Sequence, residues 1–202
     1  MKPHRTTLVP ALLLVAVLAR PGAAQGSRVS LEARGGGAFP TGDFRGQASP
    51  GWTLGATLHY PVHPDLDVYG GVQHENYPTR LLVIDGPPVV EAEGYRTLDN
   101  AVRGGLRASP RIPLAGVRPW AEAGLTYGRV TFTAPDSPDT QSNWRAGYEL
   151  GAGLGVGVGP RVTLTPGVRY RHHGTSFTSE GDEVKLDPTT RILAEAGVQI
   201  RL

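Results

Sequence analysis

The sequence of 202 residues contains no cysteine, and its single methionine is the first residue. The lack of cysteine excludes a scaffold held by disulfides and a metal site built on thiolates. After residue 25 no apolar run is long enough for a membrane-spanning helix, and no segment shows the 3.6-residue period of an amphipathic helix. The chain must therefore build its domain from another kind of element.

The one long apolar run lies at the N-terminus. Lys2 and Arg5 precede an apolar stretch at 8–19, which is too short to cross a bilayer as a helix, and Gly22-Ala23-Ala24 follows as a small-residue cleavage site. This pattern predicts a secretory signal peptide at residues 1–24, removed before Gln25. Residues 25–202 are then expected to form one domain.

The charge balance depends on this signal peptide. The whole chain has 20 basic and 18 acidic residues, but Lys2, Arg5 and Arg20 leave with the signal, so that 17 basic residues face 18 acidic ones. A nearly neutral mature chain gives no support for a nucleic-acid partner, and none is expected.

Glycine alternates with apolar residues in the stretch YELGAGLGVGVGPRVTL, residues 148–164, where it occupies positions 151, 153, 155, 157 and 159. A dinucleotide-binding turn needs the spacing G-x-G-x-x-G, which this stretch never supplies, and the lysine of a phosphate-binding loop is also missing. A period of two indicates a strand with two unlike faces, one apolar and one with almost no side chains.

The same two-faced pattern occurs eight times, and it predicts eight strands. Their ranges are 28–37, 52–60, 66–74, 98–108, 117–128, 144–158, 162–170 and 192–202. The long connections 39–51, 78–96, 134–143 and 172–191 alternate with the shorter connections 61–65, 109–116 and 159–161. Long and short loops therefore lie at opposite ends of the sheet, and the long ones are rich in the turn residues of exposed loops.

The second face of these strands is small and charged. It is predicted to form a polar network of twelve residues: Glu32, Arg34, Asp67, Asp99, Arg103, Arg107, Arg118, Glu122, Glu149, Arg169, Glu195 and Arg201. Glu75, Arg145, Arg171 and Gln199 share that face. A soluble sandwich would bury the apolar face, whereas a membrane barrel turns it outward to lipid and keeps the charged face inside.

Four observations favour the barrel. The strands are longer than the five or six residues usual in soluble proteins, their number is even, and the loops alternate in length. The apolar face also carries aromatic residues near strand ends, as a membrane girdle does: Trp52, Tyr60, Tyr127, Trp144, Tyr148 and Tyr170. Because a bilayer forbids unpaired backbone, we predict an all-β fold, a closed up-and-down eight-stranded antiparallel transmembrane β-barrel. Its narrow interior would need the inward glycines to make room for arginines and glutamates.

At this point the chain resembles the small eight-stranded outer-membrane barrels of Gram-negative bacteria, the OmpA/OmpX-like superfamily. The resemblance rests on the signal peptide, the eight strands, the run GGGAFPTGDF at 35–44 and the C-terminus AGVQIRL. Gly197, Ile200 and Leu202 fit the terminal signal read by the barrel-assembly machinery, although the usual terminal aromatic is absent. The resemblance implies an outer-membrane location in contact with lipid bilayer and lipopolysaccharide, periplasmic termini, four exposed loops and a monomer.

The expected function is structural or surface-interacting and non-enzymatic, with a lumen filled by acid–arginine pairs. Balanced charges in a narrow lumen need partners once water is scarce, which favours ion pairs over a pore lining. A narrow channel for small solutes, like the OmpW-type barrels, remains an alternative.

A lipid A-modifying enzyme is the other alternative, because the run RYRHHGTSF at 169–177 contains His173 and Ser176. The spacing departs from the His-x-Ser element of lipid A deacylases, although Glu180 and Glu183 lie nearby. A catalytic triad needs hydrogen-bond reach between its members. No cofactor or metal site is expected, since His59, His63 and His74 do not converge at ligand spacing.

Overall fold

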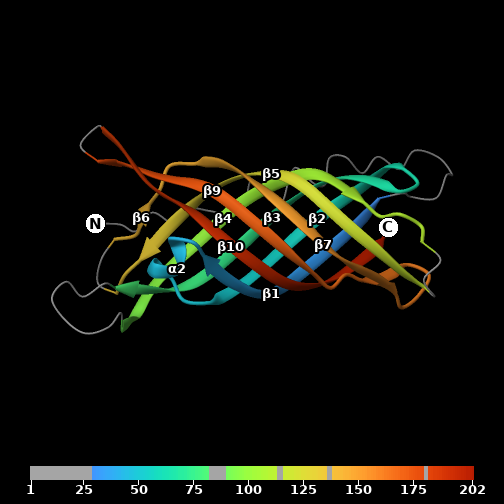
Figure 1. Cartoon of the computed structure of the whole chain (residues 1–202), viewed down its shortest axis with the longest axis horizontal. Helices are drawn as coiled ribbons and strands as arrows, with labels where there is room; N and C mark the ends of the chain where they lie inside the picture. The colour runs from blue at the N-terminus through green and yellow to red at the C-terminus, as the bar shows by residue number, and fades with distance from the viewer. Residues whose placement is uncertain (1–28, 82–89, 113–115, 136–137, 180–181) are drawn as a thin grey trace, which may run out of the picture.

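The computed structural model describes residues 29–81, 90–112, 116–135, 138–179 and 182–202 as one elongated barrel of tilted strands (Figure 1). The signal peptide predicted at 1–24 lies outside these residues. In the described part of the chain, no helix is both long and apolar enough to cross a membrane.

Ten strands and one short helix make up the described chain. They are β1 (Ser30–Thr41), α2 (Phe44–Gln47), β2 (Gly51–His63), β3 (Leu66–Leu81), β4 (Val90–Ala108), β5 (Val117–Thr133), β6 (Thr140–Gln141), β7 (Arg145–Gly157), β8 (Val162–Leu164), β9 (Gly167–Ser179) and β10 (Asp182–Arg201).

Eight of the ten strands close into a ring, and this arrangement confirms the predicted eight-stranded barrel. Each strand pairs antiparallel with the next, from β1 through β5 to β7, β9 and β10, and β10 pairs with β1 to close the barrel. The short β8 also pairs with β7 and β10, so that β8 and β9 form one line interrupted at Thr165 and Pro166. The short β6 is added to the end of β5.

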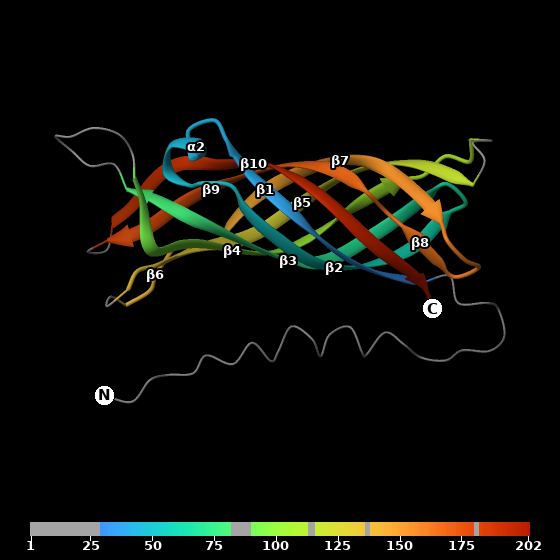
Figure 2. The same cartoon turned by 90° about the horizontal axis from the view of Figure 1, so that it is seen from below.

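The ends of β1, β3, β5 and β9, from which the four long connections start, lie with α2 at one end of the barrel, on the left of Figure 1, and the C-terminus lies at the other end. We call these the long-loop end and the short-loop end. The view from below in Figure 2 shows the same separation.

Two of the predicted long loops are wrong in extent, because much of each is strand. β3 continues to Leu81 and β4 already begins at Val90, while β9 runs to Ser179 and β10 starts at Asp182. These extensions lie beyond the strictly alternating part of each strand. Where a strand no longer faces lipid, its outward positions are free to be polar, so the two-faced pattern ends before the strand does.

The outer wall carries many exposed apolar side chains. Leu125, at the middle of β5, is 72% exposed, and Leu54 on β2 and Val168 on β9 are 55% and 53% exposed. A continuous apolar surface of this kind is rare on a soluble monomer, and it fits the lipid-facing band of a membrane barrel.

The inward glycines give room to aromatic rings as well as to charged chains. A Cβ on Gly151 would lie 3.0 Å from the Glu122 side chain, as the interpretation of the glycine run predicts. A Cβ on Gly153 would lie 2.5 Å from the ring of Trp120, which points inward and is buried. Strand β7 therefore lacks side chains where the Trp120 indole lies against it.

Candidate functional site

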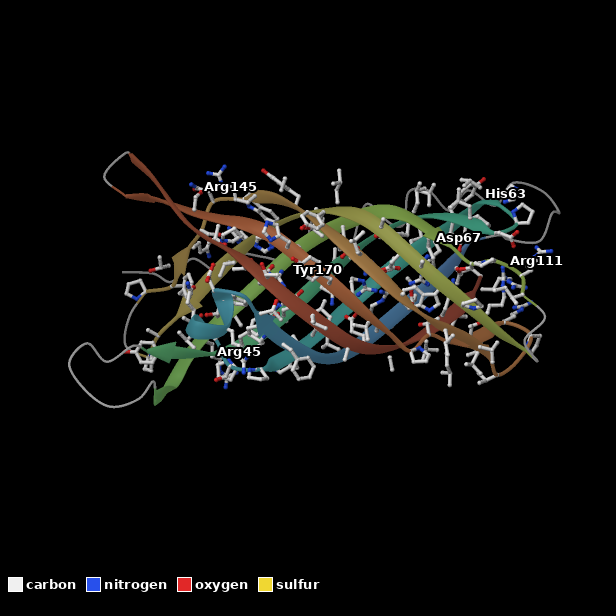
Figure 3. The ribbon with its side chains drawn as sticks, in the orientation of Figure 1. Arg45, His63, Asp67, Arg111, Arg145 and Tyr170 are labelled. Atoms are coloured by element: carbon white, nitrogen blue, oxygen red, sulfur yellow. The ribbon has the colours of Figure 1, made fainter. Side chains whose placement is uncertain are left out.

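Among the described residues, twelve charged side chains in the lumen pair with one another. Six are acids and six are arginines, so their formal charges cancel. The members of this lumen network are Glu32, Glu75, Asp99, Glu122, Glu149, Glu195, Arg34, Arg103, Arg107, Arg169, Arg171 and Arg191. Figure 3 shows side chains along the whole length of the barrel.

Glu32 organises the part of the network nearest the short-loop end. Its carboxylate pairs with Arg34, lies 2.8 Å from His59 Nε2 and 3.2 Å from Arg107, and accepts a hydrogen bond from the Thr165 hydroxyl. The partners come from β1, β2, β4 and the β8–β9 line, so one carboxylate ties four strands together.

Glu122 is the centre of the middle layer. Its two oxygens lie 2.7 Å from Arg103, 2.8 Å from Arg107 and 2.6 Å from Arg169, and Arg34 is 3.5 Å away. The guanidinium of Arg107 also lies over the Trp120 ring, 4.4 Å from its centroid. A carboxylate with several arginine partners offsets the large cost of burying these cations.

Glu149 extends the middle layer toward the long-loop end. Arg103 Nε lies 2.7 Å from Oε1, Arg171 Nη2 lies 2.9 Å from Oε2, and the Tyr69 hydroxyl donates to Oε1 at 2.8 Å. The side chain is completely buried, so each of these donors compensates for lost hydration.

The third layer lies nearest the long-loop end and centres on Glu75. Arg171 and Arg191 each lie 2.5 Å from one of its oxygens, and the Tyr77 hydroxyl donates to it at 2.5 Å. Arg191 also reaches Asp99 at 2.6 Å. The charged chain therefore continues from one end of the lumen to the other.

The first long loop closes over this layer. Phe44, on α2, packs edge-on against Tyr77 with ring centroids 5.3 Å apart, and the two residues form a small buried apolar cluster with Ala38, Ala48 and Leu193. Ala48 forms an isolated bridge with Thr79, and Ser49 donates its backbone N–H to Pro78 O. The loop thus caps the lumen as an apolar lid.

The structure places nine of the twelve predicted network residues in the lumen network and three outside it. Asp67, Arg118 and Arg201 lie at the short-loop end, where Arg118 and Arg201 are exposed. Arg118 donates to Ser109 O at 2.5 Å and lies 3.6 Å from Asp65. The prediction that they join the lumen network is wrong, because each lies within two residues of the end of its strand, where the barrel opens to water.

Sequence reasoning overlooked several lumen residues. His59, Tyr69, Tyr77 and Trp120 occupy inward positions by the period of two, so parity would have identified them. Arg191 fell in a segment predicted to be a loop, although the period of two, extended by one residue from the strand predicted at 192–202, also places this completely buried residue inward.

The six predicted girdle residues lie on the outer wall, and five of them, all but Tyr60, form ring contacts there. Tyr127 stacks on Trp144 with centroids 5.3 Å apart, and Tyr148 lies 6.1 Å from Tyr170. Trp52, Tyr127, Trp144 and Tyr148 are near the long-loop end, whereas Tyr60 is near the short-loop end. Figure 3 labels Tyr170 near the middle of the barrel.

His173 and Ser176 have separate partners. The His173 ring nitrogens face Arg191 at 3.3 Å and Asp99 at 3.4 Å. The Ser176 hydroxyl oxygen accepts from Arg145 Nε at 2.8 Å and Nη2 at 2.6 Å. Glu180 and the side chain of Glu183 lie outside what the structure describes.

Other candidate sites from the sequence are dispersed. His59 lies in the lumen, His74 on the outer wall and His63 at the exposed short-loop end. Within the described ranges, no group of three or more His, Cys, Asp or Glu side chains is arranged to hold a metal ion.

The predicted assembly signal lies on β10 and at its end. Ile200 and Leu202 point outward and are exposed, while Gly197 faces the lumen, where a Cβ would lie 2.9 Å from Glu32 Oε1. The glycine therefore has a packing role in the folded barrel, and recognition of this strand during assembly stays a prediction.

A family model described as "Outer membrane protein beta-barrel domain" matches residues 10–197. Among solved structures, the chain is similar to Neisserial surface protein A, with 17% identity, a TM-score of 0.59 and coverage of 89% of this chain and 100% of that one. It is also similar to the outer membrane protein OprG from Pseudomonas aeruginosa, with 14% identity, a TM-score of 0.55 and coverage of 88% and 98%. No curated protein sequence matches this chain significantly.

Proposed function

This chain belongs to the outer membrane protein β-barrel family, and from that membership we propose a non-enzymatic barrel with a structural or surface-interacting role in the bacterial outer membrane. Membership of this family implies a location in the bacterial outer membrane, where lipid surrounds the barrel. The role within that membrane is argued from the lumen and from the two ends of the barrel.

The filled lumen carries this proposal. Six arginines and six acids pair along the barrel, and Phe44 packs over the layer next to the long-loop end. A conducting path would require several of these buried pairs to separate, and each separation leaves an unpaired charge in a narrow space. This arrangement supports a stabilising core more strongly than a pore lining.

The proposal includes an orientation. The long-loop end faces the outside of the cell and both termini face the periplasm, with the last strand read by the barrel-assembly machinery and the folded chain acting as a monomer. Because the chain has no cysteine, single cysteines test the orientation directly. Gly46→Cys at the long-loop end should react with an impermeant maleimide on intact cells, whereas Gly159→Cys should react only after lysis. A reversed pattern would contradict the orientation.

Conductance tests the proposed role. The purified chain in a planar lipid bilayer should give no stepwise current, whereas a general porin inserted in the same way gives one. Stepwise currents that change in size or ion selectivity when Glu122 is replaced by Gln would favour the narrow-channel alternative, since Glu122 is central to the lumen network.

The enzyme alternative has its own test. His173 and Ser176 face different arginines, and a nucleophile and its base need direct hydrogen-bond contact. His173→Ala and Ser176→Ala should therefore leave the acylation of lipid A unchanged in mass spectra of cells that express the protein. A changed acyl pattern with the native chain that either variant abolishes would overturn the non-enzymatic proposal.

A further inference from the structure

Four polar or aromatic residues form a row across the outer wall toward the long-loop end. Arg129 on β5 is in register with Asn100 on β4, and Asn100 is in register with His74 on β3. Trp144, just before β7, continues the row on the other side, with its ring 5.5 Å from the Arg129 guanidinium. Strands β3, β4 and β5 lie side by side in Figure 1.

Arg129 marks the edge of the apolar wall. The other outward positions of β5, from the short-loop end up to this residue, are all uncharged: Val117, Pro119, Ala121, Ala123, Leu125 and Tyr127. Arg129 is therefore the first charge that the outer face of this strand presents beyond the lipid-facing band. A long arginine side chain at this level extends to the lipid headgroups.

The charge of Arg129 differs from the charges of the lumen arginines. Its Nη1 donates to Gln141 Oε1 at 2.7 Å, and no carboxylate of a described residue lies within ion-pair distance. Every arginine of the lumen network, in contrast, has a carboxylate partner. Among the residues that the structure describes, the row thus presents a positive charge without a carboxylate partner on the outer wall.

Neighbouring side chains add hydrogen-bond donors beside the Arg129 charge and place aromatic rings at both ends of the row. His74 Nδ1 lies 2.8 Å from Asn100 Oδ1, so that the Asn100 carbonyl is occupied and its amide N–H groups remain to donate. The Trp52 ring lies 5.3 Å from His74 at one end of the row, and Tyr127 stacks on Trp144 at the other. Such aromatic residues hold a site at the boundary between lipid and water.

We propose that the row of His74, Asn100 and Arg129 binds a phosphate group of lipopolysaccharide at the outer wall. A guanidinium with a free edge beside an amide donor matches a phosphate, which accepts several charge-assisted hydrogen bonds. Lipopolysaccharide follows from the orientation proposed above, which turns the long-loop end to the outer leaflet. The phosphate contact itself depends only on the row.

Binding is measured on the whole mature chain refolded in zwitterionic micelles, where both ends of the barrel are accessible. The probes are lipopolysaccharide, the same preparation after enzymatic removal of its phosphates, and phosphatidylglycerol. Of the three tryptophans, Trp144 belongs to the row, Trp52 lies beside His74 at its end, and the third lies in the lumen, so intrinsic fluorescence reports on binding. Lipopolysaccharide should bind most tightly, and loss of its phosphates should weaken it.

Arg129→Gln should weaken binding of lipopolysaccharide about tenfold, the effect of losing one charge-assisted hydrogen bond. Arg111→Gln removes an exposed arginine at the opposite end and should leave binding unchanged. Asn100→Ala removes only the amide donor and should give a smaller loss, which keeps a second readout if Arg129→Gln refolds poorly.

Three results would overturn the inference. The first is that Arg129→Gln and Asn100→Ala both bind lipopolysaccharide as tightly as the native chain. The second is that the native chain binds the phosphate-free preparation as tightly as intact lipopolysaccharide. The third is that it binds phosphatidylglycerol as tightly as lipopolysaccharide or more tightly. Because the micelle assay ignores orientation, a reversed cysteine-labelling pattern with intact phosphate binding would contradict the orientation alone. A correct labelling pattern without phosphate binding would contradict the site alone.

Discussion

The Tyr69 hydroxyl donates a hydrogen bond of 2.8 Å to Glu149 Oε1, which is 80 residues further along the chain. Tyr69 is on β3 and Glu149 on β7, two strands that are not neighbours in the sheet. The bond therefore crosses the lumen. Contacts of this kind hold opposite walls together, and backbone pairing between neighbouring strands cannot supply them.

Glu149→Gln should destabilise the barrel by about 3–5 kcal/mol, the usual cost of removing one partner of a buried ion pair. The amide oxygen keeps an acceptor for Tyr69, but Arg103 and Arg171 lose the negative charge that both face. Urea unfolding in detergent micelles measures the change. Asp65→Asn is the control, because its pairs are largely exposed and should contribute less than about 1 kcal/mol. Equal effects of the two substitutions would contradict the importance of the lumen network.

Gly153→Ala should destabilise the barrel by about 1–3 kcal/mol through overpacking. The new Cβ would lie 2.5 Å from the Trp120 ring and closer still to Pro166 O, so that either the ring or the backbone must move. Gly155→Ala on the same strand is the matched control, because its nearest neighbours would lie 3.4 Å away, at ordinary contact distance. The same urea titration compares them. If Gly155→Ala costs as much as Gly153→Ala, the steric explanation fails.

Pro166→Val should stabilise the barrel by about 0.5–1.5 kcal/mol, the net contribution of one hydrogen bond. Leu154 donates its N–H to Pro166 O at 3.0 Å, but proline has no N–H to return to Leu154 O. Valine would restore that bond within the apolar band, where water cannot replace it.

Pro119→Val is the control for this substitution. Pro119 is in register with Leu154 on the other side of β7, where the two residues form a pair without hydrogen bonds. The unfolding free energy of Pro119→Val should therefore stay close to that of the native chain. If Pro119→Val raises the free energy of unfolding as much as Pro166→Val does, the strand propensity of valine explains the effect and the restored hydrogen bond does not.

Phe44→Ala should detach the lid while the barrel stays folded. The buried Phe44 ring packs on Tyr77, and such a truncation typically costs about 3–5 kcal/mol, here against the stability of the loop. Arg45 follows directly and is exposed, so trypsin should cleave the loop faster in the variant. Asp43→Ala is the control, because the Asp43 side chain forms no capping hydrogen bond. A loop that resists trypsin equally in both variants would show that Phe44 does not hold it.

The period of two determined much of this protein before any coordinates. It predicted eight antiparallel strands, an outer wall that includes Leu54, Leu125 and Val168, and an inner face of acids and arginines. These features are local, because neighbouring side chains of a strand always point to opposite faces. The alternation ended where strands leave the apolar band, so the long-loop ends of β3, β4, β9 and β10 were predicted poorly.

Which acid pairs with which arginine inside the lumen depends on the closed tertiary structure of the barrel. Glu122 on β5 pairs with Arg103 on the neighbouring β4, but also with Arg169 on β9, which is not a neighbour of β5 in the sheet. Arg191 pairs with Asp99, which is 92 residues away in the chain. Closure and strand tilt together set which residues share a level in the lumen. The sequence states which side chains face inward, but the distance between any two of them depends on the curvature of the whole sheet.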